Sequence, residues 1–176
     1  MAGKTKSKPG RLPTEADGTG KARALIKSLG LQLHPEGGHF REVHRSVETV
    51  QTGKGRRSAL TTIYFLLRRG EKSVFHRVLS DEVWHFYEGA PLKLLRVGAD
   101  FKSQETVVLG PTAKGSVQVK VIPRRDWQAA ETTGDYTLVG CSVGPGFDFA
   151  DFRMMREDAR AAARLRKTFP SLIDFI

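Results

Sequence analysis

The chain has 176 residues, a formal net charge of +10 at pH 7 and a single cysteine. A chain of this length forms one domain and buries roughly 70% of the surface that it exposes when unfolded, so it needs neither disulfides nor a structural metal. The single Cys141 excludes an internal disulfide, and we expect a buried thiol in a reducing compartment. No apolar run is long enough for a transmembrane helix or a signal peptide, so we expect a cytoplasmic protein with no membrane partner.

The positive charge is concentrated at the two ends of the chain. Residues 1–30 contain seven Lys or Arg and two acidic residues, and residues 153–167 contain six Lys or Arg and two acidic residues. The middle of the chain is therefore close to neutral. A nucleic-acid interface needs basic residues gathered on the binding surface of the fold, so we expect no specific nucleic-acid partner.

The N-terminal part predicts a disordered basic tail, residues 1–20, followed by a short helix. Residues 20–29 place three apolar side chains on one helical face, namely Leu25, Ile26 and Leu29. Thr19 is the expected N-cap of this helix, and Gly30 is its expected C-terminal stop. The folded domain is expected to cover residues 21–176.

Short segments rich in Val, Ile, Leu, Tyr and Phe follow, separated by turn signals such as GPTAKG and GPG. Many short strands at this spacing predict an all-β sandwich or barrel. The predicted strands cover residues 58–67, 73–79, 82–88, 91–97, 105–109, 116–122, 136–143 and 147–154. The chain then returns to a helix over residues 157–167, which are rich in Ala and Arg and precede a helix-stopping Pro170.

The stretch SVFHRVLSDEVWHFYEG, residues 73–89, contains the strongest candidate site. Side chains alternate between the two faces of a strand. We expect a tight antiparallel turn at Ser80 and Asp81 that brings His76 and Glu82 to the same side of the sheet. An imidazole and a carboxylate placed in this way can exchange protons or bind a metal ion.

The neighbours of this pair are assigned to faces by the same alternation. Trp84 and Phe86 share a face with Glu82, and we expect them in the core or the wall of a pocket. His85 falls on the opposite face, and only a β-bulge would turn it toward Glu82. His85 and Trp84 are both retained as candidate ligand-binding residues.

The spacing of five residues in this region resembles the first cupin motif, G-x5-H-x-H-x3-E-x6-G. These residues are Gly70, His76, Val78, Glu82 and Gly89, with Val78 where cupins usually carry a second histidine. The segment PRRDWQ, residues 123–128, resembles a remnant of the second cupin motif, P-x-G-x-x-H. Arg125 stands where glycine is usual, and Gln128 stands in the histidine position.

More narrowly, the chain resembles the cupin-5 family, also called domain of unknown function 985. The resemblance runs from about Leu25 to the C-terminus and rests on LHPEGGHFREVHRS, TTIYFLL, SVFHRVLSDEVWHFYEGAPL, WQAA and YTLVGCSVGPGFDFADF. It implies a cupin-type double-stranded β-helix, or jelly-roll barrel, with a short N-terminal helix and a C-terminal helix. It also implies a homodimer and a pocket similar to that of deoxysugar-nucleotide epimerases.

Several chemistries remain open for such a pocket. One is isomerase- or epimerase-like proton transfer, with His76 as the base and Glu82 as its partner, on a small polar or anionic metabolite such as a sugar nucleotide. A second is non-catalytic binding of a sugar or another metabolite. A third is a weak divalent metal site formed by His76, Glu82 and Gln128, because Val78 cannot ligate and Gln is a poorer ligand than His. No cofactor is expected with certainty.

The segment HPEGGHFRE, residues 34–42, supplies further candidates. Arg41 either clamps an anionic ligand group or forms a structural ion pair with Glu36. His34 and His39 are expected in a turn and on the surface.

Three more candidate ligand-binding residues lie elsewhere in the chain. Tyr64 offers either a hydroxyl to the pocket or a core side chain, and Trp127 either stacks on a ring-shaped ligand or closes the end of the barrel. Gln128 is the expected hydrogen-bonding anchor of the ligand. Asp148 is expected to support the site residues.

Overall fold

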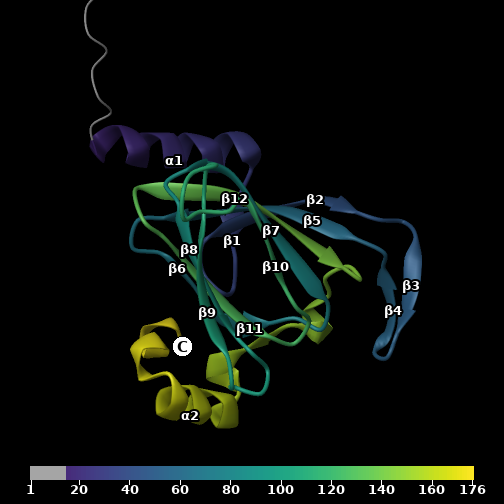
Figure 1. Ribbon diagram of the computed structural model, residues 1–176. Coiled ribbons are helices and arrows are strands. Elements are labelled where there is room, and N and C mark those ends of the chain that lie inside the picture. Colours follow the sequence, from purple (N-terminus) through teal and green to yellow (C-terminus); the bar gives the residue numbers. More distant parts are fainter. Residues whose placement is uncertain (1–14) are drawn as a thin grey trace, which may run out of the picture.

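Two antiparallel sheets face each other in the structure, a computed structural model that describes residues 15–176. Figure 1 shows α1 (Glu15–Leu29) lying across one end of the sheets and α2 (Ala159–Thr168) at the opposite end. The predicted all-β barrel with a helix near each end is confirmed. Within the described residues, no helix is long and apolar enough to cross a membrane.

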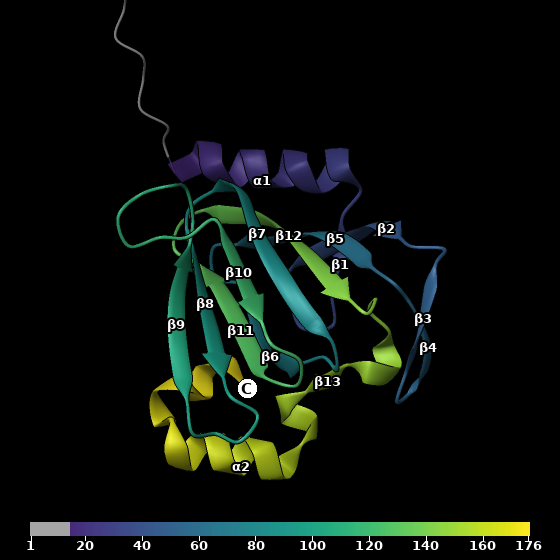
Figure 2. The ribbon, with the colours of Figure 1, turned by 45° about the vertical axis from the view of Figure 1, so that its right-hand side comes forward.

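The strands form two large sheets and one hairpin. The six-stranded sheet has the order β1 (Gln32–Leu33), β2 (His39–Arg45), β5 (Thr61–Arg68), β12 (Tyr136–Gly144), β7 (Asp81–Gly89) and β10 (Val119–Ile122). The five-stranded sheet has the order β13 (Arg153–Met154), β6 (Lys72–Arg77), β11 (Trp127–Thr132), β8 (Leu92–Val97) and β9 (Gln104–Leu109). The hairpin of β3 (Thr49–Thr52) and β4 (Gly55–Ser58) projects from one side of the barrel (Figure 2).

Strand alternation divides the apolar side chains between an inner and an outer core. In β8, Leu92 and Leu94 point between the sheets, whereas Leu95 and Val97 point outward. The outward side chains are covered by α2 and by the 3₁₀ helix η3 (Pro170–Phe175). The five-stranded sheet is therefore apolar on both faces, with its outer face closed by the C-terminal segment.

Helix α1 covers part of the outer face of the six-stranded sheet. Its apolar side chains pack against Leu66 of β5 and against Tyr136 and Leu138 of β12. The predicted N-cap Thr19 is wrong, because the helix begins at Glu15 and Thr19 lies inside it. Residues 15–20 are therefore helical, and the remainder of the predicted tail, residues 1–14, lies outside the described residues.

The predicted strand over residues 147–154 is also wrong. Residues Phe149–Asp151 form the 3₁₀ helix η1, and only Arg153–Met154 are extended. The reason is local, because the Asp148 carboxylate accepts a hydrogen bond from the backbone N–H of Ala150 at 2.8 Å and bends the chain. A second 3₁₀ helix, η2, follows at Met155–Glu157.

Four strand regions were not predicted, and one of them is the two-residue β1. Strand β2 and the hairpin β3–β4 have mostly exposed, polar side chains, so they lack the apolar alternation of a half-buried strand. Strand β11 contains two alanines in WQAAET and has little β-propensity. It is nevertheless the central strand of the five-stranded sheet, between β6 and β8.

Candidate functional site

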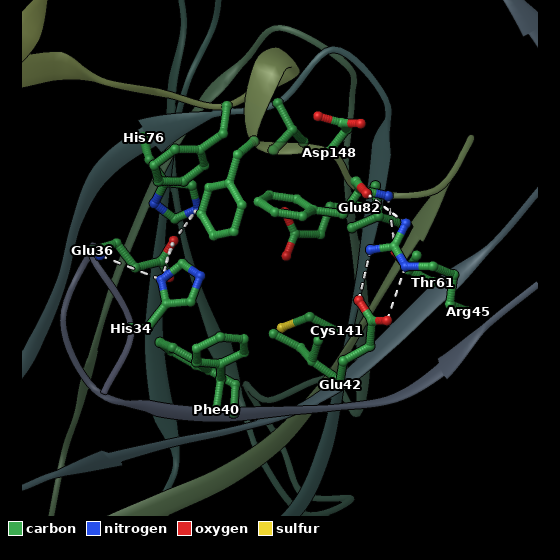
Figure 3. Close-up of a pocket in the computed structure, with 17 residues that line it drawn as sticks. His34, Glu36, Phe40, Glu42, Arg45, Thr61, His76, Glu82, Cys141 and Asp148 are labelled. Carbon is green, nitrogen blue, oxygen red and sulfur yellow. Dashed lines mark hydrogen bonds and ion pairs between the residues drawn. The ribbon is translucent and has the colours of Figure 1, made fainter. Parts of the chain in front are cut away.

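A pocket of about 300 Å³, here called the barrel pocket, lies between the two sheets. Its lining combines ionisable groups with many aromatic and aliphatic side chains. The lining residues are His34, Glu36, Phe40, Glu42, Arg45, Thr61, Ile63, Phe65, His76, Val78, Glu82, Cys141, Val143, Phe147, Asp148, Phe149 and Phe152. Figure 3 shows His34, Glu36 and His76 on one side of the pocket and Glu82, Thr61 and Arg45 on the other.

His76 and Glu82 reach this pocket by a route different from the predicted hairpin. Strand β6 belongs to the five-stranded sheet and β7 belongs to the six-stranded sheet, so the two strands do not pair. The chain between them crosses from one sheet to the other. His76 and Glu82 therefore face each other across the barrel interior, and the predicted tight antiparallel turn at Ser80 and Asp81 is wrong.

The direct partner of His76 is Glu36. His76 Nε2 lies 3.2 Å from Glu36 Oε2, and both side chains are buried. His76 Nδ1 lies 2.9 Å from the carbonyl oxygen of Val74. Because a carbonyl only accepts hydrogen bonds, Nδ1 carries a proton and, in the neutral ring, Nε2 presents its lone pair to Glu36. One proton is therefore shared between Glu36 and His76. Ser73 Oγ donates to the other carboxyl oxygen of Glu36 at 2.8 Å.

His34 lies on the other side of Glu36 and was not predicted to be in the site. Its Nδ1 accepts a hydrogen bond from the backbone N–H of Glu36 at 3.3 Å, so Nε2 carries the proton of the neutral ring. Figure 3 shows this second nitrogen directed toward the cavity. The ring is held edge-on to Phe40, with ring centroids 4.6 Å apart. His34 therefore offers the pocket an oriented N–H donor.

Glu82 is held by Gln128 from behind the pocket. Gln128 Nε2 donates to Glu82 Oε2 at 2.5 Å, and Gln128 Oε1 accepts from Trp84 Nε1 at 2.9 Å. Gln128 is fully buried and does not line the barrel pocket. The predicted role of Gln128 as a ligand anchor does not match this geometry, because both ends of its amide are already hydrogen-bonded inside the protein.

Burial shifts the protonation of these groups toward their neutral forms. It raises the pKa of the Glu36 carboxyl and of the Glu82 carboxyl, the latter also because Glu36 is nearby. It lowers the pKa of the His34 and His76 imidazoles below 6.5, although the negative charge of Glu82 acts in the opposite direction on His76. Both histidines are therefore neutral at pH 7, and both carboxyls hold protons more tightly than exposed ones do.

The remaining ligand-binding candidates lie outside the barrel pocket. Arg41 is exposed and donates from Nη1 to the carbonyl oxygen of Leu29 at 2.7 Å, so neither the anion clamp nor the ion pair with Glu36 matches its geometry. Tyr64 packs near α1, and Trp127 is fully buried in the outer core under the guanidinium of Arg77. Tyr64 lies on the face of β5 opposite to the pocket residues Ile63 and Phe65. Trp127 lies on the face of β11 opposite to Gln128, whose side chain reaches Glu82 in the interior.

The faces assigned to β7 match the structure. Trp84 packs in the inner core, and Phe86 lies against the same core. His85 is half-buried and does not line the pocket. His39 is buried, 3.6 Å from Glu71, so its predicted surface position is wrong.

The residues present do not fit a metal ion. Across residues 15–176, no group of three or more His, Cys, Asp or Glu side chains is arranged to hold one. Within the predicted set of His76, Glu82 and Gln128, the amide oxygen of Gln128 is already bound to Trp84. We therefore derive no metal-dependent step for this pocket.

A family model described as Cupin superfamily (DUF985) matches residues 23–155. The chain belongs to this family. A hypothetical protein from Leishmania major is 32% identical, with a TM-score of 0.77, and the match covers 88% of this cupin and 96% of that chain. A protein from Shewanella oneidensis is also 32% identical, with a TM-score of 0.76, and covers 88% and 95% of the two chains.

More distant structures show the cupin fold alone. A cupin 2 domain-containing protein from Halorhodospira halophila is 18% identical, with a TM-score of 0.53, and the match covers 82% of this cupin and 86% of that chain. No curated protein matches the chain. The family and fold are thus established, and the site must be interpreted from its own geometry.

Sequence reasoning missed most of the wall of the barrel pocket. Glu36 was identified, but with Arg41 rather than His34 and His76 as its neighbours. Cys141 was assigned to the core, and it is buried, but it also lines the pocket. The three phenylalanines of GPGFDFADF were assigned to a strand, although all three form a cluster at the pocket, namely Phe147, Phe149 and Phe152.

Proposed function

We propose that the barrel pocket binds a small metabolite and transfers a proton to or from a carbon atom next to its carbonyl group, as isomerases and epimerases do. The observation that carries this proposal is the arrangement of three buried ionisable groups. Glu36 and His76 share a proton on one side, and Glu82 lies across the cavity with Gln128 holding it in place. Buried acid–base groups with shifted pKa values are typical of sites that transfer protons.

Each group has a role that follows from its contacts. Glu82 and the Glu36–His76 pair lie on opposite sides of the cavity, so one side removes a proton from the bound metabolite and the other returns one. The electron pair released from the broken C–H bond moves onto the carbonyl oxygen. His34 Nε2–H is the oriented donor that stabilises the negative charge on this oxygen.

The size and lining of the pocket limit the metabolite. A cavity of about 300 Å³ is at the small end of ligand-binding pockets. Three phenylalanine rings, Phe147, Phe149 and Phe152, support a flat or apolar face of the ligand near the ring of His76. We therefore propose a metabolite of about the size of one sugar, with its carbonyl end among the ionisable groups.

The test is hydrogen–deuterium exchange of candidate metabolites in D₂O, followed by proton NMR. The panel contains aldoses and ketoses, their phosphates, and sugar nucleotides. We expect the wild-type protein to exchange a C–H proton next to the carbonyl of at least one of them. His76→Gln and Glu82→Gln should slow this exchange by about 100-fold or more. His85→Gln is the matched control, because His85 lies on the outward face of β7 and should leave the rate unchanged.

Non-catalytic binding is the second candidate function, and the largely apolar lining favours it. In that case a panel member raises the melting temperature without any exchange. Exchange that persists in both His76→Gln and Glu82→Gln would place the chemistry elsewhere. The homodimer and the cytoplasmic location expected from the sequence remain predictions.

A further inference from the structure

A second hollow of about 410 Å³ lies next to the barrel pocket. Its wall comes from the hairpin turn, the β6–β7 connection, the β10–β11 turn and the segment that follows β12. The lining residues are Gln51, Thr52, Gly53, Lys54, Leu79, Ser80, Arg124, Arg125, Pro145 and Asp151. We call it the basic hollow.

The basic hollow and the barrel pocket share parts of their walls. Val78 lines the barrel pocket, and the next two residues, Leu79 and Ser80, line the basic hollow. Val143 also lines the barrel pocket, and Pro145, two residues later in the chain, lines the basic hollow. The two cavities therefore lie side by side at the same end of the barrel.

Three cations in the basic hollow have no internal partner. Among the described residues, the side chains of Lys54, Arg124 and Arg125 make no hydrogen bond or ion pair. The one lining carboxylate, Asp151, is neutralised by Arg57, which donates to its two oxygens at 2.8 and 3.0 Å. The Asp81 carboxylate lies beside the turn and accepts a hydrogen bond from the backbone N–H of Arg124 at 2.8 Å, but it does not line the hollow. The lining thus presents three positively charged side chains without an ion-pair partner.

The backbone of Arg125 adopts a conformation that favours glycine. Its φ angle is +71°, and its N–H donates to the carbonyl oxygen of Val78 at 2.8 Å. A side chain larger than hydrogen is unfavourable in this region of backbone space. The bond to Val78 also attaches the β10–β11 turn to the wall of the barrel pocket. An arginine here places a guanidinium at the edge of the basic hollow in spite of the less favourable backbone.

We propose that the basic hollow binds the phosphate or diphosphate group of the metabolite whose reacting end enters the barrel pocket. The proposal rests on the proposed function for the choice of metabolite. Two guanidinium groups and one ammonium group suit phosphate oxygens, which accept the forked N–H donors of arginine. A ligand with a single carboxylate group would leave most of the 410 Å³ hollow empty and would neutralise only part of its positive charge. The substrate class is therefore a phosphorylated or diphosphate-linked small molecule.

The first experiment is a calorimetric titration of the full chain with inorganic pyrophosphate, at an ionic strength of about 0.15 M to screen long-range charge effects. The test variant is Lys54→Gln/Arg124→Gln/Arg125→Gln. We expect its affinity for pyrophosphate to fall by at least about tenfold. The matched control is Arg160→Gln/Arg166→Gln/Lys167→Gln on α2, which removes the same charge from exposed positions away from the hollow. The control should bind as the wild type does.

Two outcomes would overturn the proposal. One is the absence of pyrophosphate binding by the wild type, and the other is an equal loss of affinity in both triple variants, which would indicate a general effect of charge. The variant His76→Gln separates this proposal from the proposed function. It should bind pyrophosphate normally even where proton exchange in the barrel pocket is lost.

The single variant Arg125→Gly tests whether the guanidinium group of Arg125 contributes to anion binding. Glycine relieves the left-handed backbone, so the melting temperature should not fall, while pyrophosphate binding weakens. A lower melting temperature with unchanged pyrophosphate binding would mean that Arg125 serves the fold and not the anion.

Discussion

At the scale of single residues, the site depends on Gln128, which is fully buried between Trp84 and Glu82. The position corresponds to a ligand histidine in the cupin motif that the sequence resembles. Here the amide instead donates to one buried side chain and accepts from another. It aligns Glu82 toward the cavity without reaching the cavity itself. Gln128 is therefore a positioning residue.

We expect Gln128→Leu to lower the free energy of unfolding by about 2–4 kcal/mol, because it leaves the Trp84 N–H and one Glu82 oxygen buried without partners. Urea denaturation measures this difference. Gln118→Leu is the matched control, because Gln118 is exposed and the same substitution should change stability by less than about 0.5 kcal/mol there. Equal effects of the two substitutions would contradict the role of Gln128.

Glu82 should make the stability of the protein depend on pH. Burial raises its pKa in the folded state above the ordinary 4.5, so the folded protein keeps a proton that the unfolded chain has released. This contribution is therefore most favourable below pH 4.5 and is lost as the pH rises through the folded-state pKa. Glu82→Gln cannot ionise, so its stability relative to the wild type should increase as the pH rises above 4.5. Denaturation curves at several pH values measure the difference in the free energy of unfolding between the variant and the wild type. A difference that does not vary with pH would contradict a raised pKa of Glu82 in the folded protein.

At the scale of elements, the 3₁₀ helix η1 forms part of the pocket wall and is fastened to the projecting hairpin. Arg57 on β4 donates to both carboxylate oxygens of Asp151 in η1. Arg45 on β2 donates to the carbonyl oxygen of Phe147 at 3.1 Å, just before η1. Two separate strands thus hold a short segment that has little regular structure of its own.

We expect Arg57→Gln to loosen η1 while the sheets stay intact. Hydrogen exchange at the backbone amides of residues 150–152 should become faster, because their turn hydrogen bonds open more often when Asp151 is released. Mass spectrometry of the exchanged protein measures this change. Arg56→Gln is the matched control, since Arg56 bonds to Thr49 within the hairpin. Unchanged exchange at residues 150–152 in Arg57→Gln would show that the ion pair does not fasten η1.

At the scale of the whole molecule, one sheet separates two cores. The inner core lies between the sheets beside the barrel pocket, and the outer core lies under α2 and η3. Residues of β6, β8 and β11 contribute to both the outer core and the interior, because alternate side chains of a strand point in opposite directions. The C-terminal segment therefore supports the five-stranded sheet without contributing to the lining of the pocket.

Leu165 of α2 is fully buried in the outer core, and we expect Leu165→Ala to lower the free energy of unfolding by about 2–5 kcal/mol. The loss combines the transfer of fewer apolar atoms out of water with the cavity left behind. Chemical denaturation measures it. Arg166→Ala is the control, because Arg166 is the exposed neighbour of Leu165, and it should change stability by less than about 0.5 kcal/mol. A small effect at Leu165 would mean that α2 is not needed to close the outer face of the sheet.

The features predicted correctly from the sequence are those encoded by neighbouring residues. Alternation alone assigned Glu82, Trp84 and Phe86 to one face of a strand and His85 to the other, as in β7. Recurrent short apolar segments indicated the all-β fold, and the Ala-rich C-terminal segment indicated a helix. Strands with a weak apolar pattern were not predicted, as in the polar hairpin and the Ala-containing β11.

The partners within the site were decided only by the tertiary structure. Glu36 meets His76 because β6 carries His76 into the interior beside the segment that precedes β2, and Gln128 meets Glu82 because facing sheets bring β11 opposite β7. The basic hollow likewise joins Lys54 to Arg124 and Arg125 from distant turns. The sequence by itself determined the barrel and the faces of its strands, since periodicity acts over a few residues. Contacts between segments tens of residues apart depend on how the sheets pack, which local periodicity does not specify.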